Sequence, residues 1–160
     1  MIFISVGTQK FQFNRLLEDI DKLIEKKIIK EEVFAQIGHS TYLPKNYNYT
    51  RFLNQHDFHE LINSCSIYVT HGGVGSIQNG LRFGKKEIVF PRLAKYKEHV
   101  DNHQIEIAKK YEELGYVKKC ESQSDLEKVI INMDNFTSKY VSGRIENKVL
   151  DFIIKYIDGE

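Results

Sequence analysis

The sequence predicts an α/β fold, a Rossmann-like parallel sheet with helices on both faces. Short apolar runs with the length of strands alternate with longer segments whose apolar residues recur at helical spacing. This alternation favours a parallel sheet, because each helix that connects two parallel strands packs on one face of the sheet. A chain of 160 residues is long enough to bury a hydrophobic core. No linker or repeat divides it, so we expect a single domain over residues 1–160.

Six short, largely apolar segments are predicted as strands. The first ends at Gly7, the fourth runs into His71, and Pro91 breaks the fifth. The strands are expected at residues 2–6, 32–37, 49–53, 66–70, 87–90 and 116–120. Ligands of parallel sheets bind at the carboxyl ends of the strands, where loops lead into helices. The loops that follow these strands are therefore the expected place of a site.

The segments between and after the strands are predicted as helices. In the first, apolar residues from Phe13 to Ile24 recur three and four positions apart. Asp57 is expected to cap the second helix, and Gly84 and Gly115 are expected to end the third and fourth. The helices are expected at residues 11–29, 57–64, 75–83, 99–114, 124–133 and 139–157. The last has an apolar face, which packs either on its own sheet or on a partner.

The composition is that of an ordinary soluble protein. The formal net charge is only +1 and the lysine pairs are scattered, whereas nucleic-acid-binding domains carry a basic face. Cys65 and Cys120 lack CxxC spacing, which indicates reduced packing residues. The start of the chain has neither the basic residues nor the length of a signal peptide, and no apolar run approaches the roughly 20 residues that cross a bilayer. We expect a cytoplasmic protein without a nucleic-acid partner.

The most informative segment is Thr70-His71-Gly72-Gly73-Val74-Gly75-Ser76, between a predicted strand and a predicted helix. Glycine lets the backbone approach a ligand closely. The free N–H groups and positive dipole at a helix start suit an anion such as pyrophosphate. Ser76 adds a hydroxyl donor and His71 another polar contact. A plain glycine turn with a capping serine is the alternative; the sequence has neither a G-x-S-x-G elbow nor a P-loop string.

A second loop follows the first predicted strand. Gly7 and Thr8 lie between that strand and the first helix. Their N–H groups and the threonine hydroxyl are suited to donate to phosphate. An ordinary turn is the alternative.

The third loop, residues 99–104, carries side chains that can hydrogen-bond sugar hydroxyls: Asp101, Asn102 and Gln104. On a helix, His99 and His103 share one face and Asp101 turns away. On a strand all three share a face, and H-x-D-x-H can ligate a metal. The apolar residues that follow favour the helix, and a helix start without any ligand is a third interpretation.

These three loops, in this order and at this spacing, resemble the C-terminal, donor-binding domain of family 28 glycosyltransferases over roughly residues 1–130. The likeness is greatest to small single-domain members. They include the catalytic subunit that adds the second N-acetylglucosamine to the dolichol-linked oligosaccharide, and bacterial capsule or exopolysaccharide subunits of the β-1,4-galactosyltransferase type. The residues that carry the resemblance are Ile4 to Thr8, Gln36 to Gly38, Thr70 to Ser76, Gly84, Lys85, Pro91 and Asn102 to Gln104.

The resemblance implies a single half of a GT-B fold that binds a UDP-sugar. Phe52 and Leu53 match the segment that holds the uracil ring, and His103 with Gln104 matches the segment that touches the donor sugar. Asn79 stands where many members have a glutamate that holds the ribose hydroxyls, and Lys86 replaces a common proline. The expected UDP-sugar site consists of Gly7, Thr8, Phe52, Leu53, His71, Gly72, Gly73, Gly75, Ser76, Asn79, Asp101, His103 and Gln104.

The resemblance also implies a reaction and a partner. A hexose moves with inversion from a UDP-sugar to a lipid-linked saccharide acceptor in capsular or exopolysaccharide synthesis, without a cofactor or a metal. A membrane-anchored, acceptor-binding subunit completes the enzyme and holds this chain at the inner face of the cell membrane. Assembly of the chain into a homodimer is an additional option. The general base is His71, by its chemistry alone, or a residue of the partner. The alternatives are a non-catalytic accessory subunit that enhances such a partner and a stand-alone nucleotide-binding regulator.

Overall fold

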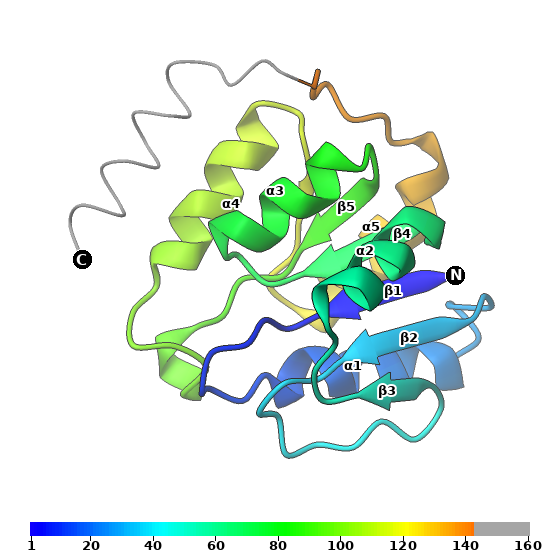
Figure 1. Ribbon diagram of the computed structural model, residues 1–160, viewed down its shortest axis with the longest axis vertical. Coiled ribbons are helices and arrows are strands. Elements are labelled where there is room, and N and C mark those ends of the chain that lie inside the picture. The colour runs from blue at the N-terminus through cyan, green and yellow to red at the C-terminus, as the bar shows by residue number, and fades with distance from the viewer. Residues whose placement is uncertain (143–160) are drawn as a thin grey trace.

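The computed structural model describes residues 1–142, and a parallel sheet forms its centre (Figure 1). The six strands lie in the order β3-β2-β1-β4-β5-β6, and every neighbouring pair is parallel. They are β1 (Ile2–Ser5), β2 (Val33–Gln36), β3 (Asn48–Thr50), β4 (Ile67–Thr70), β5 (Lys86–Val89) and β6 (Lys118–Lys119). The strand order reverses between β1 and β4, which is where Rossmann-like sheets bind ligands. The predicted parallel sheet is confirmed.

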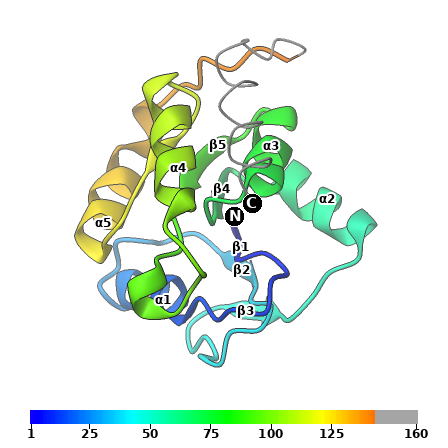
Figure 2. The same ribbon diagram turned by 90° about the vertical axis from the view of Figure 1, so that its left-hand side faces the viewer.

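Helices cover both faces of the sheet, as predicted. They are α1 (Asn14–Glu25), α2 (Gln55–Ser64), α3 (Val74–Arg82), α4 (His103–Glu113) and α5 (Gln123–Asn132). Apolar side chains of α1 and α5 pack on one face of the sheet, and those of α2, α3 and α4 pack on the other. Figure 2 shows α1 and α5 on the opposite side from α2 and α3. Two short 3-10 turns, Ala94–Tyr96 and Met133–Asn135, follow β5 and α5.

Alternate residues of the same strand fill the two faces of the sheet. In β1, Ile2 and Ile4 belong to the apolar cluster formed with α1, whereas Phe3 packs with Tyr68 and Ile62 on the α2 side. The α1 side chains that face the sheet are fully buried: Leu16, Leu17, Ile20 and Leu23. Burial of each such side chain contributes about 1.5–3 kcal/mol, so the strand ends that carry the loops rest on a rigid core. The two cysteines are buried free thiols, as predicted.

Helix α1 is shorter at both ends than the predicted helix over residues 11–29. Before it, the Phe13 N–H donates to Ser40 Oγ at 3.0 Å. After it, Lys27 has a φ of 60°, and the N–H groups of Ile28 and Ile29 turn back to the Leu23 carbonyl at 3.0 and 3.2 Å. Phe13 and Ile29 nevertheless lie in the core. Because both residues fit the helical spacing, the predicted helix was extended into flanking loops whose apolar side chains are buried in the core without being helical.

Two other predicted boundaries are wrong. Helix α2 is capped by Asn54 and not by Asp57: the Asn54 Oδ1 accepts from the Asp57 N–H at 2.8 Å. Helix α4 begins at His103 and not at residue 99, because residues 97–102 form turns and bends. Gly84 and Gly115 do end α3 and α4 as predicted, with φ values of 68° and 77° that favour glycine.

Most of the predicted C-terminal helix, residues 143–157, lies outside the described part of the chain. The described residues 139–142 are not helical. The Lys139 N–H donates to the Gly115 carbonyl at 3.0 Å, and the Tyr140 ring packs edge-on against Tyr116 at 5.4 Å between centroids. Within residues 1–142, none of the helices combines the length and the apolar character needed to cross a bilayer.

Candidate functional site

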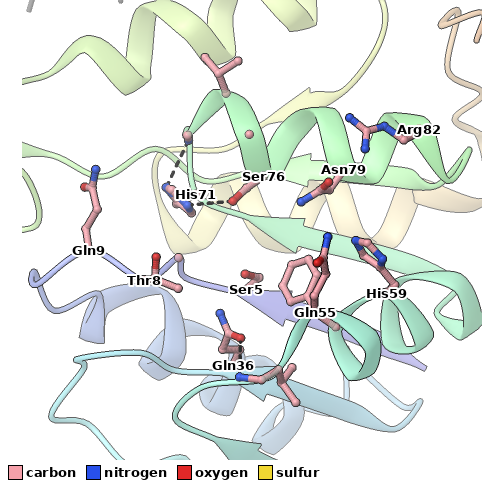
Figure 3. A pocket seen from close by; sticks show the side chains of 16 residues that line it. Ser5, Thr8, Gln9, Gln36, Gln55, His59, His71, Ser76, Asn79 and Arg82 are labelled. Carbon is pink, nitrogen blue, oxygen red and sulfur yellow. Dashed lines mark hydrogen bonds between the residues drawn. The ribbon is translucent and has the colours of Figure 1, made fainter. Parts of the chain in front are cut away.

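A cleft of about 610 Å³ opens at the carboxyl ends of β1 and β4, where the strand order reverses. The start of α3 forms one wall, and residues of α2 form the opposite wall (Figure 3). Part of the predicted site lines this cleft: Gly7, Thr8, Leu53, His71, Gly73, Gly75, Ser76 and Asn79. Three segments that are far apart in the sequence therefore meet at one place, as the sequence predicts for the loops of a parallel sheet.

The amino end of α3 faces this cleft without a cap. Gly73 is the N-cap residue and offers no side-chain acceptor, and the first turn holds no acidic residue. The N–H groups of Val74, Gly75 and Ser76 have no acceptor within the helix, because the first turn of any helix leaves its donors unpaired. The helix dipole adds partial positive charge at the same place. This arrangement attracts an anion.

The glycines around the cleft differ in what an added side chain would meet. A Cβ at Gly75 meets nothing within 4 Å, so the space beside it is open to the cleft. A Cβ at Gly7 would lie 2.5 Å from His71 Nε2, and one at Gly73 would lie 2.4 Å from His71 Cε1. A Cβ at Gly72 would lie 2.6 Å from the Gln104 Cβ. Three of these glycines therefore make room for the chain's own side chains, and Gly75 alone borders empty space.

His71 lies buried between Gly7 and Gly73. Its Nε2 is 3.1 Å from Ser76 Oγ, and its Nδ1 is 3.2 Å from both the Gly73 N–H nitrogen and Gln104 Nε2. Burial, reinforced by the nearby Arg92 cation, lowers the pKa of His71 to about 3. The ring is therefore neutral at physiological pH and already hydrogen-bonded at both nitrogens. His71 has no unengaged ring nitrogen in this arrangement, and the choice between His71 and the partner as the general base stays a prediction.

The other end of the cleft is built by one face of α2 and the later turns of α3. Gln55, Phe58 and His59 lie three and four positions apart on α2, and Arg82 lies three positions after Asn79 on α3. These residues were not predicted as part of the site, although their helical spacing could have revealed a shared face. Gln9, Ser5 and Gln36 also line the cleft and were missed.

Five residues of the predicted site do not line this cleft. Phe52 is 46% exposed and packs edge-on against His39. Gly72 and Gln104 are held together behind the cleft, where the Gly72 N–H donates to Gln104 Oε1 at 3.1 Å. Asp101 and His103 line a neighbouring cleft of about 680 Å³ that shares Gln9 with the first.

Asp101 organises the second cleft. Its Oδ1 accepts from the His103 N–H at 3.0 Å and lies 3.1 Å from His99 Nδ1, while its Oδ2 lies 3.4 Å from His103 Nδ1. The expectation that Asp101 turns away from the two histidines is therefore wrong, because the helix starts only at His103. Within residues 1–142, no three histidine, cysteine, aspartate or glutamate side chains are grouped to hold a metal ion.

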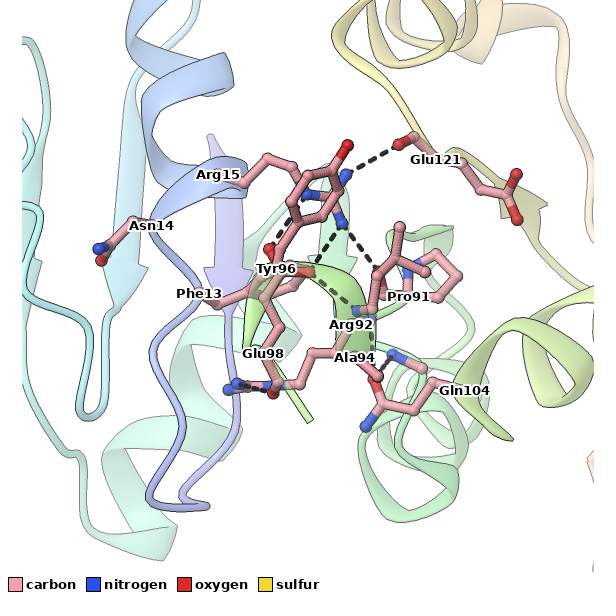
Figure 4. Close-up of polar contacts among 12 residues, drawn as sticks. Phe13, Asn14, Arg15, Pro91, Arg92, Ala94, Tyr96, Glu98, Gln104 and Glu121 are labelled. Atoms are coloured by element: carbon pink, nitrogen blue, oxygen red, sulfur yellow. Dashed lines mark hydrogen bonds and ion pairs between the residues drawn. The ribbon is translucent and has the colours of Figure 1, made fainter. Parts of the chain in front are cut away.

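A buried ion network fixes the loops around both clefts (Figure 4). Arg92 donates to the carbonyls of Phe11 at 3.1 Å and Gln12 at 3.2 Å, and also to that of Val6. The Glu98 carboxylate pairs with Arg15 at 2.9 Å. Burial lowers the pKa of Arg92 to about 10, so its guanidinium remains charged at neutral pH. The network joins the loop after β1 to the loop after β5.

A parallel sheet with an open, uncapped helix start at its switch point defines an α/β domain suited to phosphate or nucleotide ligands. The family model of the glycosyltransferase family 28 C-terminal domain matches residues 1–152. The chain therefore belongs to that glycosyltransferase family.

Solved structures with a similar fold include several glycosyltransferases and a putative UDP-N-acetylglucosamine 2-epimerase. The NMR structure of ALG13 has a TM-score of 0.61 at 19% identity, over 96% of this chain and 92% of that one. Acinetobacter baumannii MurG has a TM-score of 0.54 at 18% identity, over 82% of this chain and 40% of that one. The glycotransferase of kitacinnamycin has a TM-score of 0.59 at 21% identity, over 82% of this chain.

At these identities the likeness is one of fold. The chain spans 34% of the kitacinnamycin enzyme, and it has the fold of one half of a GT-B glycosyltransferase. No curated protein sequence matches it.

Proposed function

We propose that this chain is the donor-binding and catalytic subunit of a two-component, inverting glycosyltransferase. It moves a hexose from a UDP-sugar to a lipid-linked acceptor in capsular or exopolysaccharide synthesis. The observation that carries the proposal is the uncapped start of α3, open to a cleft in a glycosyltransferase family 28 domain. A membrane-anchored partner supplies the acceptor-binding half and holds the chain at the inner face of the membrane.

The diphosphate lies at the start of α3. The N–H groups of Val74, Gly75 and Ser76 and the Ser76 hydroxyl donate to its oxygens, and Thr8 adds a hydroxyl from the opposite loop. Hydrogen bonds to charged oxygens are shorter and stronger than neutral ones. The absence of an acidic residue from this first turn supports the choice of an anionic ligand, because nothing there competes for the dipole.

The nucleoside extends toward α2, and the sugar extends toward Gln9. Asn79 contacts the ribose hydroxyls. The Leu53 N–H is already taken by Gln36 Oε1 at 3.0 Å, so the Leu53 carbonyl is the backbone group offered to the uracil ring. The donor hexose reaches past Gln9 to Asp101 and His103 in the second cleft.

Transfer is a direct displacement at the anomeric carbon. The acceptor hydroxyl oxygen forms a bond to that carbon on one face, the bond to the UDP oxygen breaks on the other, and the hydroxyl proton goes to a base. Preorganised N–H donors at α3 stabilise the charge that develops on the leaving diphosphate. Because His71 is buried, neutral and bonded at both nitrogens, the base is assigned to the partner subunit.

A binding screen followed by a transfer assay tests the proposal. Isothermal titration of the chain with UDP-galactose, UDP-glucose, UDP-glucuronic acid and UDP-N-acetylglucosamine should show binding of at least one, competed by UDP. This chain, co-expressed with its proposed membrane-anchored partner, should then transfer the labelled hexose to the lipid-linked acceptor. Full transfer by a pair that carries Ser76→Ala and Gly75→Leu would refute the catalytic role and favour a non-catalytic accessory subunit.

A further inference from the structure

The orientation of the Gln104 side-chain amide is determined by two backbone donors. Gln104 is 4% exposed, and its Oε1 lies 3.1 Å from the Gly72 nitrogen and 3.0 Å from the Arg92 nitrogen. Both of these nitrogens carry a hydrogen, so the amide atom that faces them must be the oxygen. The amide nitrogen of Gln104 therefore points to His71 Nδ1, at 3.2 Å.

The tautomer of His71 follows from this orientation. His71 Nδ1 receives hydrogens from Gln104 Nε2 and from the Gly73 N–H, each at 3.2 Å. A ring nitrogen that accepts carries no proton of its own, so the single proton of the neutral ring is on Nε2. That N–H points to Ser76 Oγ, 3.1 Å away.

Ser76 then becomes a donor. Its oxygen accepts from His71, which leaves its hydroxyl hydrogen for the cleft or for the neighbouring phenol of Tyr68, which itself donates to Thr70 Oγ1 at 3.4 Å. Ser76 lies in the first turn of α3, beside the free N–H groups. An anion at that turn is a stronger acceptor than the neutral Tyr68 phenol, so it can take both the amide hydrogens and the Ser76 hydroxyl hydrogen.

We infer that Gln104 is a positioning residue that fixes the Nε2–H tautomer of His71 and so makes Ser76 a hydrogen-bond donor to the diphosphate. The inference rests on the proposed UDP-sugar site and replaces the expected contact between Gln104 and the donor sugar. The opposite tautomer would turn an acceptor nitrogen toward Ser76 and draw its hydroxyl hydrogen away from the ligand. The direction of the whole chain of hydrogen bonds is set by Gly72 and Arg92, two backbone groups that do not titrate.

Nitrogen-15 NMR of the histidine side chains of the full chain tests the tautomer directly. We expect His71 to carry its proton on Nε2 and none on Nδ1, unchanged from about pH 6 to about pH 8. The charged and titratable groups that face His71 are Arg92 and His99, and both disfavour the imidazolium. A proton on Nδ1 in the wild-type chain would overturn the inference without reference to any variant.

Gln104→Glu tests the consequence for binding. A glutamate of the same shape still accepts from Gly72 and Arg92, but its second oxygen can only accept, so it holds a proton on His71 Nδ1. We expect UDP-galactose to bind about tenfold to hundredfold more weakly at about pH 8. The affinity should recover in part as the pH falls and the His71 ring becomes doubly protonated. UDP-galactose is the probe because its diphosphate diester does not titrate in this range.

Two variants separate this mechanism from a general effect of charge or packing. Gln78→Glu adds the same charge on α3 but contacts Tyr111, at 2.6 Å, and not His71; it should leave the tautomer and the pH profile unchanged. In a Ser76→Ala background, Gln104→Glu should lose its pH-dependent effect. A pH dependence that persists without the Ser76 hydroxyl would refute the inference. If the wild-type chain binds none of the UDP-sugars, the proposed function fails, whereas the NMR result still decides the tautomer.

Discussion

Replacing Gly75 with leucine should weaken the binding of UDP without lowering the stability of the folded protein. A Cβ at Gly75 meets nothing within 4 Å, and Gly75 lines the cleft, so a leucine at this position extends into the cleft. Gly75 is the second residue of α3, and its φ is not in the left-handed region. Leucine favours a helix over glycine by up to about 1 kcal/mol. The unliganded variant should therefore be as stable as the wild type or more stable.

The expected loss of affinity follows from the donors that the new side chain covers. The leucine occupies the space in front of the N–H groups of Gly75 and Ser76, where the diphosphate is proposed to lie. Each hydrogen bond to a charged oxygen contributes about 1.5–3 kcal/mol. Loss of one such bond weakens UDP binding roughly tenfold to hundredfold, and loss of two abolishes binding at ordinary ligand concentrations.

Gly80→Ala is the matched control on the same helix. A Cβ at Gly80 would lie 2.3 Å from Glu87 Oε2 and 2.6 Å from Tyr68 Cδ1, so this variant should lose stability. Its affinity for UDP should be unchanged wherever it is folded. Thermal unfolding of the free protein and calorimetric titration with UDP measure the two properties separately. Wild-type affinity in Gly75→Leu would refute the placement of the diphosphate.

Three further predictions address the surrounding structure. Glu98→Gln removes the charged partner of Arg15 from a pair whose carboxylate is 1% exposed, so it should lower the free energy of unfolding in urea by about 3 kcal/mol. The control Glu121→Gln changes a carboxylate that is 41% exposed and should lower it by less than about 0.5 kcal/mol. Equal losses of stability would contradict the network. Asn79→Glu should raise the preference for UDP over its 2′-deoxy analogue about tenfold, because a carboxylate binds ribose hydroxyls more strongly than an amide, and an unchanged ratio of dissociation constants would remove Asn79 from the ribose site. Burial raises the pKa of Glu87 well above 4.5, so the folded state holds a proton that the unfolded state releases. The bound proton therefore contributes to the stability of the folded state below the unfolded pKa, and this contribution is lost as the pH rises toward the folded pKa. The Tm of Glu87→Gln relative to the wild type should therefore increase from about pH 5 to about pH 9, and a constant difference would contradict the buried neutral carboxyl.

Local patterns were sufficient for the sheet, the helices and the loop that begins at His71. Apolar runs and helical spacing depend on neighbours in the sequence, and so does the position of Gly84 and Gly115 at helix ends. The same patterns failed where distant residues decide the outcome. Helix α1 starts late because the Phe13 N–H is bound by Ser40, and no local rule reveals that contact.

The sequence indicated which polar residues lie near the site, but not which partners their side chains bind. Gln104 has the chemistry to bind a sugar, but its amide is consumed by Gly72, Arg92 and His71. Arg92 is fully buried, which its charge alone argues against. The carbonyls of Val6, Phe11, Gln12 and Glu98 accept from its guanidinium and make that burial tolerable. Such roles depend on tertiary contacts that the sequence does not display.

Amide chemical shifts of the full chain titrated with UDP test the central claim most directly. We expect the N–H resonances of Val74, Gly75 and Ser76 to move downfield and saturate together, while resonances at the opposite ends of the strands stay in place. Saturable UDP binding that leaves these three amides unmoved would contradict it.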